Sequence, residues 1–203
     1  MSRLQIQSKA SIITMQYFTD DYRSIIRERD KSFYKTKDEY NELDNFSYVI
    51  QRYTGREYQC LNDYLRKGIV GGDFTKKELK SWAYCLHSSL QFRISNVSNG
   101  TVVYRGISLP APSDWRVGSR FYFGEFISTS LDINVAKRFA GYGGTLLVIT
   151  IKNNGTNGRN NYCRYIEDIT QYPDEEEIII TAFCIFTIKD IDGNTYYLDC
   201  EGY

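Results

Sequence analysis

The chain has 203 residues, of which 42% are hydrophobic and 15% aromatic, a composition typical of one globular domain or at most two small ones. Its 25 basic side chains balance its 25 acidic ones, so no net charge favours nucleic acid or an anionic membrane as a partner. His87 is the only histidine, so a catalytic triad would have to use it, and zinc sites that need two histidines are excluded. We expect carboxylates, arginines and hydroxyls to carry any enzyme chemistry.

The five cysteines lack the Cys-x-x-Cys spacing of a zinc site. No apolar run approaches the roughly 18 residues that a membrane-spanning helix needs, and residues 1–15 lack the apolar core of a signal peptide. The sequence therefore predicts no metal site and no membrane span.

The first half of the chain has a helical pattern. Charged and apolar residues alternate at helical spacing over residues 17–40, 46–51 and 57–67. Thr75 and Glu78 then have the spacing of a capping box, which predicts the start of a further helix. We expect His87, on that helix, to be a partly buried packing residue.

The second half has short strand-like runs around one helix at residues 133–140. Asp192 and Gly193 predict a hairpin turn between the last two strands. Folding that hairpin brings Cys184 within about one residue of facing Cys200, close enough for a disulfide in an oxidising compartment. The predicted strands cover residues 102–104, 120–126, 145–151, 177–186 and 196–198.

These patterns predict one α+β domain over residues 1–203. Its helical lobe covers residues of about 15–95, and an antiparallel β core covers about 100–203.

Two segments of the β half carry polar groups where packing alone does not require them. Arg105 ends a strand and precedes Gly106, so its planar fork could bind a phosphate or a carboxylate; an ordinary edge arginine is the alternative. In the run Ser128-Thr129-Ser130, we expect Ser130 to cap the helix that begins near residue 132. One of the other two hydroxyls should point inward and need a partner.

A third segment is acidic and leads directly into an apolar strand. By the two-residue period of a strand, Glu175 and Glu177 share one face and Glu176 points the other way. Paired carboxylates suit the stabilisation of a developing cation or the binding of a guanidinium, whereas a solvated loop is the alternative.

Together the segments resemble the arginine-serine-glutamate class of mono-ADP-ribosyltransferases. That family has an aromatic-Arg-Gly strand, a Ser-Thr-Ser strand and a Glu-x-Glu strand, in the order found here. Phe139-Ala140-Gly141 and Tyr172 also match its phosphate–nicotinamide and recognition loops, and the resemblance covers roughly residues 50–190. It implies a helical lobe followed by a two-sheet β core, and NAD as co-substrate without a metal.

The resemblance also implies a role for each motif residue. Glu177 stabilises the cation formed when nicotinamide leaves, Ser128 orients Glu177, and Glu175 engages the nucleophile. A glutamate at the position of Glu175 goes with arginine acceptors in the family, and Tyr172 helps to dock the target protein. The positions implied to contact NAD are Arg105 at the pyrophosphate, Gly106, Thr129, Ser130, Phe139 at the nicotinamide end, Tyr58 and Asn62.

The sequence departs from the family at Tyr142, where related enzymes often have an arginine that Arg138 could replace. We expect the glycine-rich residues 141–144 to form a flexible loop near the phosphates. The other large class of ADP-ribosylating enzymes needs a histidine in a core strand, which the helical position of His87 disfavours.

The expected partners are NAD and a target protein that presents an arginine, with the chain as a monomer and no nucleic acid bound. A secreted protein or a delivered effector is favoured over a cytoplasmic one. Two alternatives are an NAD glycohydrolase, with water as acceptor, and a catalytically inactive binding module on the same scaffold.

Overall fold

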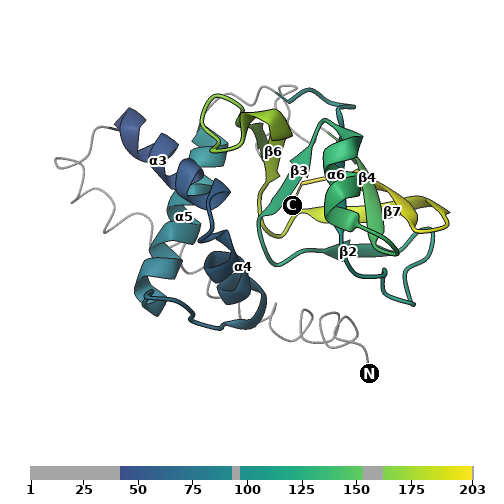
Figure 1. Cartoon of the computed structure of the whole chain (residues 1–203), viewed down its shortest axis with the longest axis horizontal. Helices are drawn as coiled ribbons and strands as arrows, with labels where there is room; N and C mark the ends of the chain where they lie inside the picture. The colour runs from purple at the N-terminus through teal and green to yellow at the C-terminus, as the bar shows by residue number, and fades with distance from the viewer. Residues whose placement is uncertain (1–41, 93–96, 153–161, 203) are drawn as a thin grey trace. The chain divides into compact units, whose positions relative to one another are not determined.

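A computed structural model describes residues 42–92, 97–152 and 162–202, which divide into two compact units between Ser89 and Leu90 (Figure 1). We call them the helical unit and the β unit. The helix predicted at residues 17–40 lies outside the described residues. Within the described ranges, no helix combines the length and the apolar character that a membrane crossing requires.

The helical unit contains the three helices that the apolar periodicity predicts after residue 42. The predicted capping box is confirmed, since the Thr75 N–H donates to Glu78 Oε2 at 2.7 Å and the Glu78 N–H donates to Thr75 Oγ1 at 3.2 Å. His87 is buried, as expected of a packing residue. The helices are α3 (Glu42–Thr54), α4 (Tyr58–Lys67) and α5 (Lys76–Phe92).

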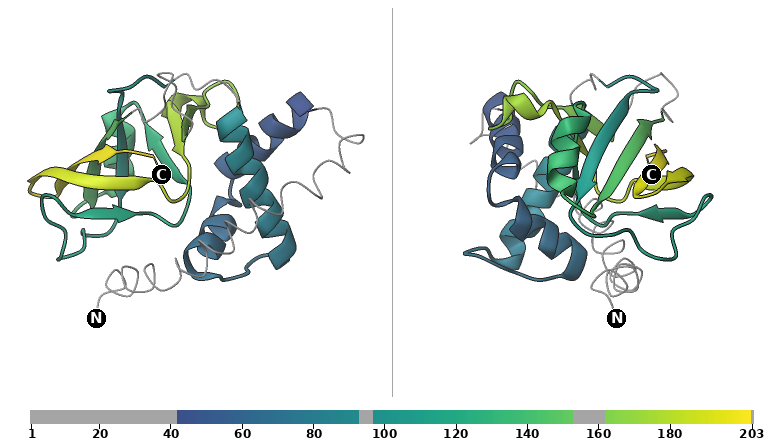
Figure 2. Two further views of the ribbon diagram at one scale, coloured as in Figure 1. Left: turned by 180° about the vertical axis from the view of Figure 1, so that it is seen from behind. Right: turned by 45° about the vertical axis from the view of Figure 1, so that its right-hand side comes forward.

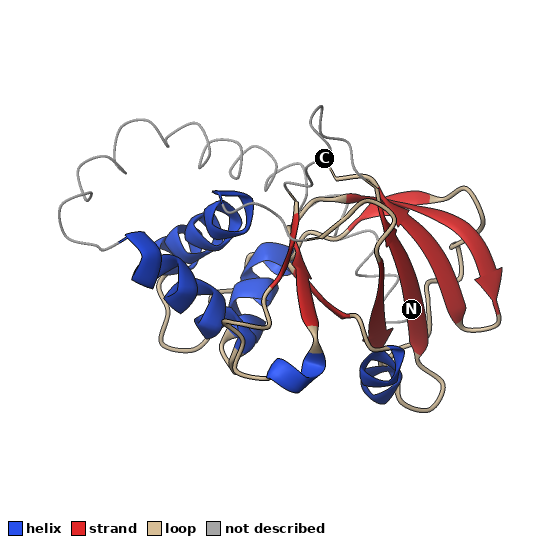
Figure 3. Cartoon of the chain, turned by 90° about the horizontal axis from the view of Figure 1, so that it is seen from above, coloured by secondary structure: helices blue, strands red, loops and turns tan. Residues whose placement is uncertain are grey.

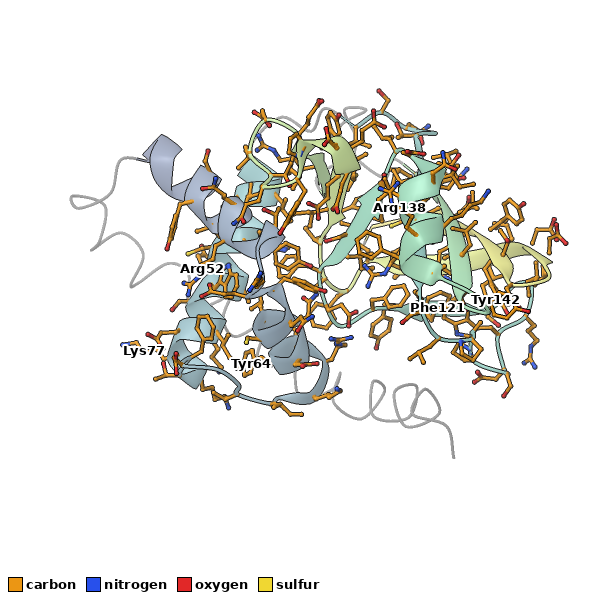
Figure 4. All side chains as sticks on the ribbon, in the orientation of Figure 1. Arg52, Tyr64, Lys77, Phe121, Arg138 and Tyr142 are labelled. Atoms are coloured by element: carbon orange, nitrogen blue, oxygen red, sulfur yellow. The ribbon has the colours of Figure 1, made fainter. Side chains whose placement is uncertain are left out.

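An arginine stabilises the packing of the helical unit. The guanidinium of Arg52, labelled in Figure 4, lies 4.8 Å from the ring centroids of both Phe74 and Trp82, and it forms an ion pair with Glu57. The two rings stack on each other with their centroids 5.7 Å apart. Arg52 is therefore held by both its charge and its flat face.

The β unit is built on one hydrogen-bonded sheet in the order β2-β7-β8-β4-β1-β3-β6-β5. Its strands lie side by side in Figure 3, and Figure 2 shows the C-terminal pair β7 and β8 in yellow. The strands are β1 (Val102–Ile107), β2 (Arg120–Tyr122), β3 (Ile127–Ser130), β4 (Thr145–Ile151), β5 (Cys163–Tyr165), β6 (Glu177–Ile180), β7 (Ile185–Asp192) and β8 (Thr195–Cys200); the helices are α6 (Ile133–Ala140) and the 3-10 turn η2 (Pro173–Glu175).

The structure differs from the expected two-sheet antiparallel core. The eight strands of the described residues follow in one order, and β1 joins β3 through the single residue pair Tyr104↔Ser130. The hairpin between β7 and β8 places β8 beside β4, and these two strands run parallel to each other. The α+β class itself is confirmed.

Several element boundaries follow from the sequence and others do not. The helix at residues 133–140 and the strand at 145–151 are confirmed. The run at residues 177–186 is two strands, because Phe183 adopts a left-handed φ of 67° and turns the chain between β6 and β7. No glycine or proline marks that turn. The run at residues 120–126 keeps strand structure only over β2, and β5 was not predicted.

The predicted C-terminal hairpin is confirmed, but not the pairing of its cysteines. Asp192 pairs with Thr195 across the turn, and that register places Phe186, not Cys184, opposite Cys200. All five cysteines are free thiols. The Cys184 thiol is buried, which raises its pKa well above the usual value, and the nearby Cys200 thiol adds to that rise. The two thiols are neighbours within the core without a covalent link.

Helix α6 packs directly on the sheet through positions that admit no side chain. A Cβ on Gly106 of β1 would lie 1.9 Å from the Ala136 carbonyl oxygen, and one on Gly144 would lie 2.1 Å from the Ala140 carbonyl oxygen. Gly144, the last residue of the predicted glycine loop 141–144, therefore closes a tight contact, while Gly141 and Gly143 have open space around them, and the flexibility of the loop stays a prediction. This contact fixes the C-terminal turn of α6 against the end of β1.

Candidate active site

Glu177 is the most buried carboxylate of the acidic segment, with 5% of its surface exposed. It is the first residue of β6, whose four residues are all buried, and it pairs with Ser130 of β3. Its carbonyl oxygen accepts the Ile166 N–H at 3.0 Å, which fixes the backbone on the other side. The carboxylate is thus held at the edge of the core by strands on both sides.

Two hydroxyls and two charges surround the Glu177 carboxylate. Thr170 Oγ1 donates to Glu177 Oε2 across 3.4 Å, and the Ser128 hydroxyl lies close enough to this carboxylate to lower its pKa. Burial raises the pKa of Glu177, and the negative charge of Glu175 adds to that rise. The Ser128 and Thr170 hydrogen bonds and the positive charge of Arg105 act in the opposite direction. The structure places Ser128 on the strand next to Glu177, and its role in orienting the carboxylate stays a prediction.

Glu175 and Glu176 do not follow the alternation that a strand would impose. Glu175 ends the 3-10 turn η2, and Glu176 adopts a left-handed φ of 45°, so the two-residue period does not apply to them. Glu176 is nonetheless exposed, while Glu175 is half-buried and interacts electrostatically with Glu177. Burial raises the pKa of Glu175, and the charge of Arg138 on α6 (labelled in Figure 4) opposes this shift.

Arg105 lies on β1 with its guanidinium held from two sides. Its Nη1 donates to the Ser128 carbonyl oxygen at 2.9 Å, and its Nη2 lies 3.7 Å from Glu125 Oε1. Glu125 is 5% exposed, so this ion pair is largely shielded from water. Arg105 Nε is buried and has no hydrogen-bond partner among the residues that the structure describes. Because Ser128 and Glu125 each contact only one of the two terminal nitrogens, N–H groups on both remain available to an anion.

The other two hydroxyls of the Ser128-Thr129-Ser130 run are buried and bonded to the backbone. Thr129 Oγ1 donates to the Ile178 carbonyl oxygen at 2.8 Å, which confirms an inward hydroxyl with a partner. Ser130 Oγ accepts the Asp132 N–H at 2.9 Å. Asp132, not Ser130, caps α6, because Ser130 is still in the strand and the Asp132 carboxylate accepts the Asn134 N–H.

Three aromatic side chains of the β unit are exposed near these elements. Phe139 on α6 is 59% exposed, and Tyr172 at the start of η2 is 49% exposed. Tyr142, in the turn after α6, is fully exposed (Figure 4). Exposed aromatic rings of this kind can stack on a ligand ring or on a partner protein.

The two predicted NAD contacts of the helical unit lie one helical turn apart on α4. Tyr58 is 40% exposed and packs edge-on against Tyr53, with the ring centroids 6.2 Å apart. Asn62 is buried, and its Nδ2 donates to the Tyr53 hydroxyl at 3.1 Å. These contacts give both side chains a packing role within the helical unit, and their contact with NAD stays a prediction.

Sequence reasoning missed two polar residues of the site, Glu125 and Thr170. Glu125 had a usable signal, since it is an acid inside the apolar and aromatic run that leads to Phe126 and Ile127. Such an acid is either exposed or paired, and here it is paired with Arg105. Thr170 had no such signal, because it lies in a loop where a threonine is ordinary.

The arrangement brings together a buried carboxylate at the start of β6, a half-buried carboxylate from η2 and an arginine from β1; Arg105 lies within that strand, whereas the sequence predicted that it ends the strand. A fixed carboxylate in shielded surroundings stabilises positive charge that develops beside it, and an arginine beside it can hold the anionic part of the same ligand. In the part of the chain that the structure covers, no group of three or more side chains is arranged to hold a metal ion.

The family model of the ADP-ribosyltransferase exoenzymes matches residues 34–198. Among solved structures, a mutant of the eukaryotic mono-ADP-ribosyltransferase ART2.2 in complex with NAD is 22% identical, with a TM-score of 0.62 over 99% of this chain and 88% of that chain. The ADP-ribosyltransferase Vis in complex with agmatine is 18% identical, with a TM-score of 0.60 over 100% and 86%. Plx2a, an ADP-ribosyltransferase toxin from Paenibacillus larvae, is 18% identical, with a TM-score of 0.60 over 90% and 97%. No curated protein matches the sequence.

Proposed function

The chain belongs to the ADP-ribosyltransferase exoenzyme family, and we propose that it transfers one ADP-ribose from NAD to an arginine side chain of a target protein and releases nicotinamide. The observation that carries this proposal is the placement of Glu177: a buried carboxylate held by Ser128 and Thr170, with Glu175 and Arg105 as its charged neighbours. The reaction needs such an anion.

The first step breaks the bond between the nicotinamide nitrogen and C1′ of the ribose. The bonding electron pair leaves with nicotinamide, and the ribose becomes an oxocarbenium-like cation. Glu177 stabilises this cation electrostatically and accepts a hydrogen bond from a ribose hydroxyl, while Ser128 keeps the carboxylate in place. Because burial excludes water from Glu177, its charge acts more strongly than an exposed carboxylate would.

The second step forms the bond to the acceptor. A guanidinium nitrogen of the target arginine attacks C1′, and the proton that it loses passes to Glu175 and then to solvent. The pKa of Glu175, raised by partial burial, suits a group that accepts this proton. Support for arginine as acceptor also comes from Vis, a protein of the same fold that is found with agmatine, whose guanidinium resembles that of arginine.

The rest of NAD is bound by the strand and helix ends around this carboxylate. Arg105 binds the pyrophosphate with the donors that Ser128 and Glu125 leave available, and ART2.2, which shares the fold, is found with NAD. Phe139 packs against the nicotinamide end, and the exposed ring of Tyr172 docks the target protein. Gly106, Thr129 and Ser130 shape this site through the backbone contacts described above.

The same proposal extends to the setting of the protein. One chain is sufficient for the site, so we expect a monomer that acts on a separate target protein. Plx2a is a toxin and has the same fold, which favours a secreted protein or a delivered effector.

Nicotinamide release from NAD with and without agmatine tests the proposal. We expect release to accelerate when agmatine is added, with ADP-ribosyl-agmatine as product. Glu175→Gln should abolish the acceleration and leave slow release to water, whereas Glu176→Gln, the exposed neighbour, should behave as the wild type. Release that agmatine does not change would favour an NAD glycohydrolase, and no release at all would favour an inactive binding module.

A further inference from the structure

Thr170 links the candidate catalytic carboxylate to the loop that carries the exposed ring of Tyr172. It lies in the segment between β5 and η2, and its side chain is half-buried. Thr170 Oγ1 is 3.4 Å from Glu177 Oε2 and 3.1 Å from the backbone nitrogen of Tyr172. One side-chain oxygen therefore contacts both the carboxylate at the start of β6 and the loop backbone at Tyr172.

The direction of the two hydrogen bonds follows from the chemistry of a hydroxyl. A backbone N–H can only donate, so the Thr170 oxygen accepts from Tyr172. The hydroxyl has a single hydrogen, and the carboxylate of Glu177 can accept it. The loop is anchored on the other side as well, because the Thr170 N–H donates to the Ile166 carbonyl oxygen at 2.9 Å. Thr170 is consequently held in a defined position.

We propose that Thr170 is a positioning residue for Glu177. The Thr170 hydroxyl donates to the Glu177 carboxylate and so couples the position of that carboxylate to the conformation of the loop at Tyr172. This inference rests on the proposed function. Since Tyr172 is the predicted docking residue, a target protein that shifts the loop also shifts the Thr170 hydroxyl relative to the carboxylate.

The length of the contact indicates how Thr170 would act. At 3.4 Å the hydrogen bond is longer than the usual 2.5–3.0 Å, so it is weak in the free protein. Hydrogen bonds at catalytic groups commonly shorten when substrate binds. A small movement of the loop toward Glu177 on substrate binding would therefore strengthen the Thr170–Glu177 hydrogen bond. It would do so at the stage of the reaction in which Glu177 must be ionised.

The ionisation of Glu177 gives a readout that a purely structural role would not affect. Glu175 from η2 and Arg105 from β1 are the charged groups that act on this carboxylate, while Ser128 from β3 and Thr170 donate hydrogen bonds to it. Loss of the Thr170 hydroxyl removes one influence that lowers the pKa of Glu177 and leaves burial, Ser128, Glu175 and Arg105 in place.

The experiment compares Thr170→Val, which removes the hydroxyl at constant size, with Thr170→Ser, which retains it. The chain offers a matched control, because Thr187 Oγ1 of β7 also donates at 3.4 Å to a carboxylate, that of Glu201 after β8. The measurements are kcat and KM for nicotinamide release over pH, and the pKa of Glu177 from carbon-13 NMR of its carboxyl group.

For Thr170→Val we expect kcat to fall about tenfold, while KM for NAD stays nearly unchanged. A loss of about tenfold is what removing one hydrogen bond to a charged group produces. The acid limb of the pH profile and the pKa of Glu177 should both move to higher pH. Thr170→Ser should restore all three values, and Thr187→Val should match the wild type.

Two results would overturn the inference: a Thr170→Val protein with wild-type kcat and pKa of Glu177, or a Thr170→Ser protein as impaired as Thr170→Val. Should valine unfold the chain, Thr170→Ala removes the same hydroxyl and is measured in its place. A wild-type protein that does not cleave NAD refutes the proposed function instead. The NMR pKa of Glu177 still decides the role of Thr170 in that case.

Discussion

Replacement of Arg105 by methionine should destabilise the β unit, independently of any effect on NAD. The substitution removes the guanidinium that lies 3.7 Å from the buried Glu125 carboxylate and the donor to the Ser128 carbonyl oxygen. Breaking a fully buried ion pair costs roughly 3–5 kcal/mol. The Arg105 side chain is 21% exposed and the contact is long, so we expect a loss of about 2 kcal/mol.

The companion substitution Glu125→Gln identifies the source of this loss. If the unneutralised charge of Glu125 causes it, the double variant Arg105→Met, Glu125→Gln should lose about 1 kcal/mol less than the sum of the single variants. Urea unfolding monitored by tryptophan fluorescence provides the free energies. Of the two tryptophans, Trp115 stacks on Phe121 in the β unit, so a Trp82→Phe background confines the signal to that unit.

Strict additivity of the two substitutions would refute this reasoning, since it would mean that the two side chains do not interact. A matched pair provides the control. Arg120 and Glu201 form an exposed ion pair at 2.9 Å, and its double-mutant cycle should give a coupling of at most about 1 kcal/mol.

Further predictions concern packing, pH and thiol reactivity. Gly106→Ala should lower the free energy of unfolding by about 3 kcal/mol in urea titrations, because its Cβ would overlap the backbone of α6, whereas Gly71→Ala, with open space around it, should have little effect. Glu177→Gln should raise the free energy of unfolding at pH 7, and this gain should vanish toward pH 4. The reason is that a carboxyl group whose pKa is raised in the folded state stabilises the fold below its unfolded pKa, and this stabilisation is lost as the pH rises. A gain that grows in acid would contradict this sign. Cys60 should react with a thiol reagent faster than the buried Cys184, as mass spectrometry of labelled peptides would show.

The sequence predicted most of the fold because its local signals are strong. The capping box at Thr75 and the apolar helix of residues 133–140 are local patterns, and both are present in the structure. The break between β6 and β7 was not predictable in this way. Phe183 takes a left-handed conformation without a glycine, because a hydrogen bond to the Phe123 carbonyl oxygen holds its N–H.

The candidate site was predictable where side-chain type and spacing carry the chemistry, and not where the backbone decides. The proximity of Ser128 and Glu177 follows from neighbouring strands β3 and β6. Glu175 does not lie near Glu177 through the two-residue period of a strand. The 3-10 turn η2 and the left-handed backbone of Glu176 bring it there. Thr170 contributes through loop geometry, which no spacing rule in the sequence reveals.

The identity of the residue that receives ADP-ribose tests the central proposal most directly. The measurement incubates the protein with labelled NAD and a cell lysate, and maps the modified side chains by mass spectrometry. We expect ADP-ribose on arginine for the wild type and no transfer for Glu177→Gln, whose thermal unfolding should show an intact fold. Transfer by Glu177→Gln at the wild-type rate, or wild-type transfer to residues other than arginine, would contradict the assignment.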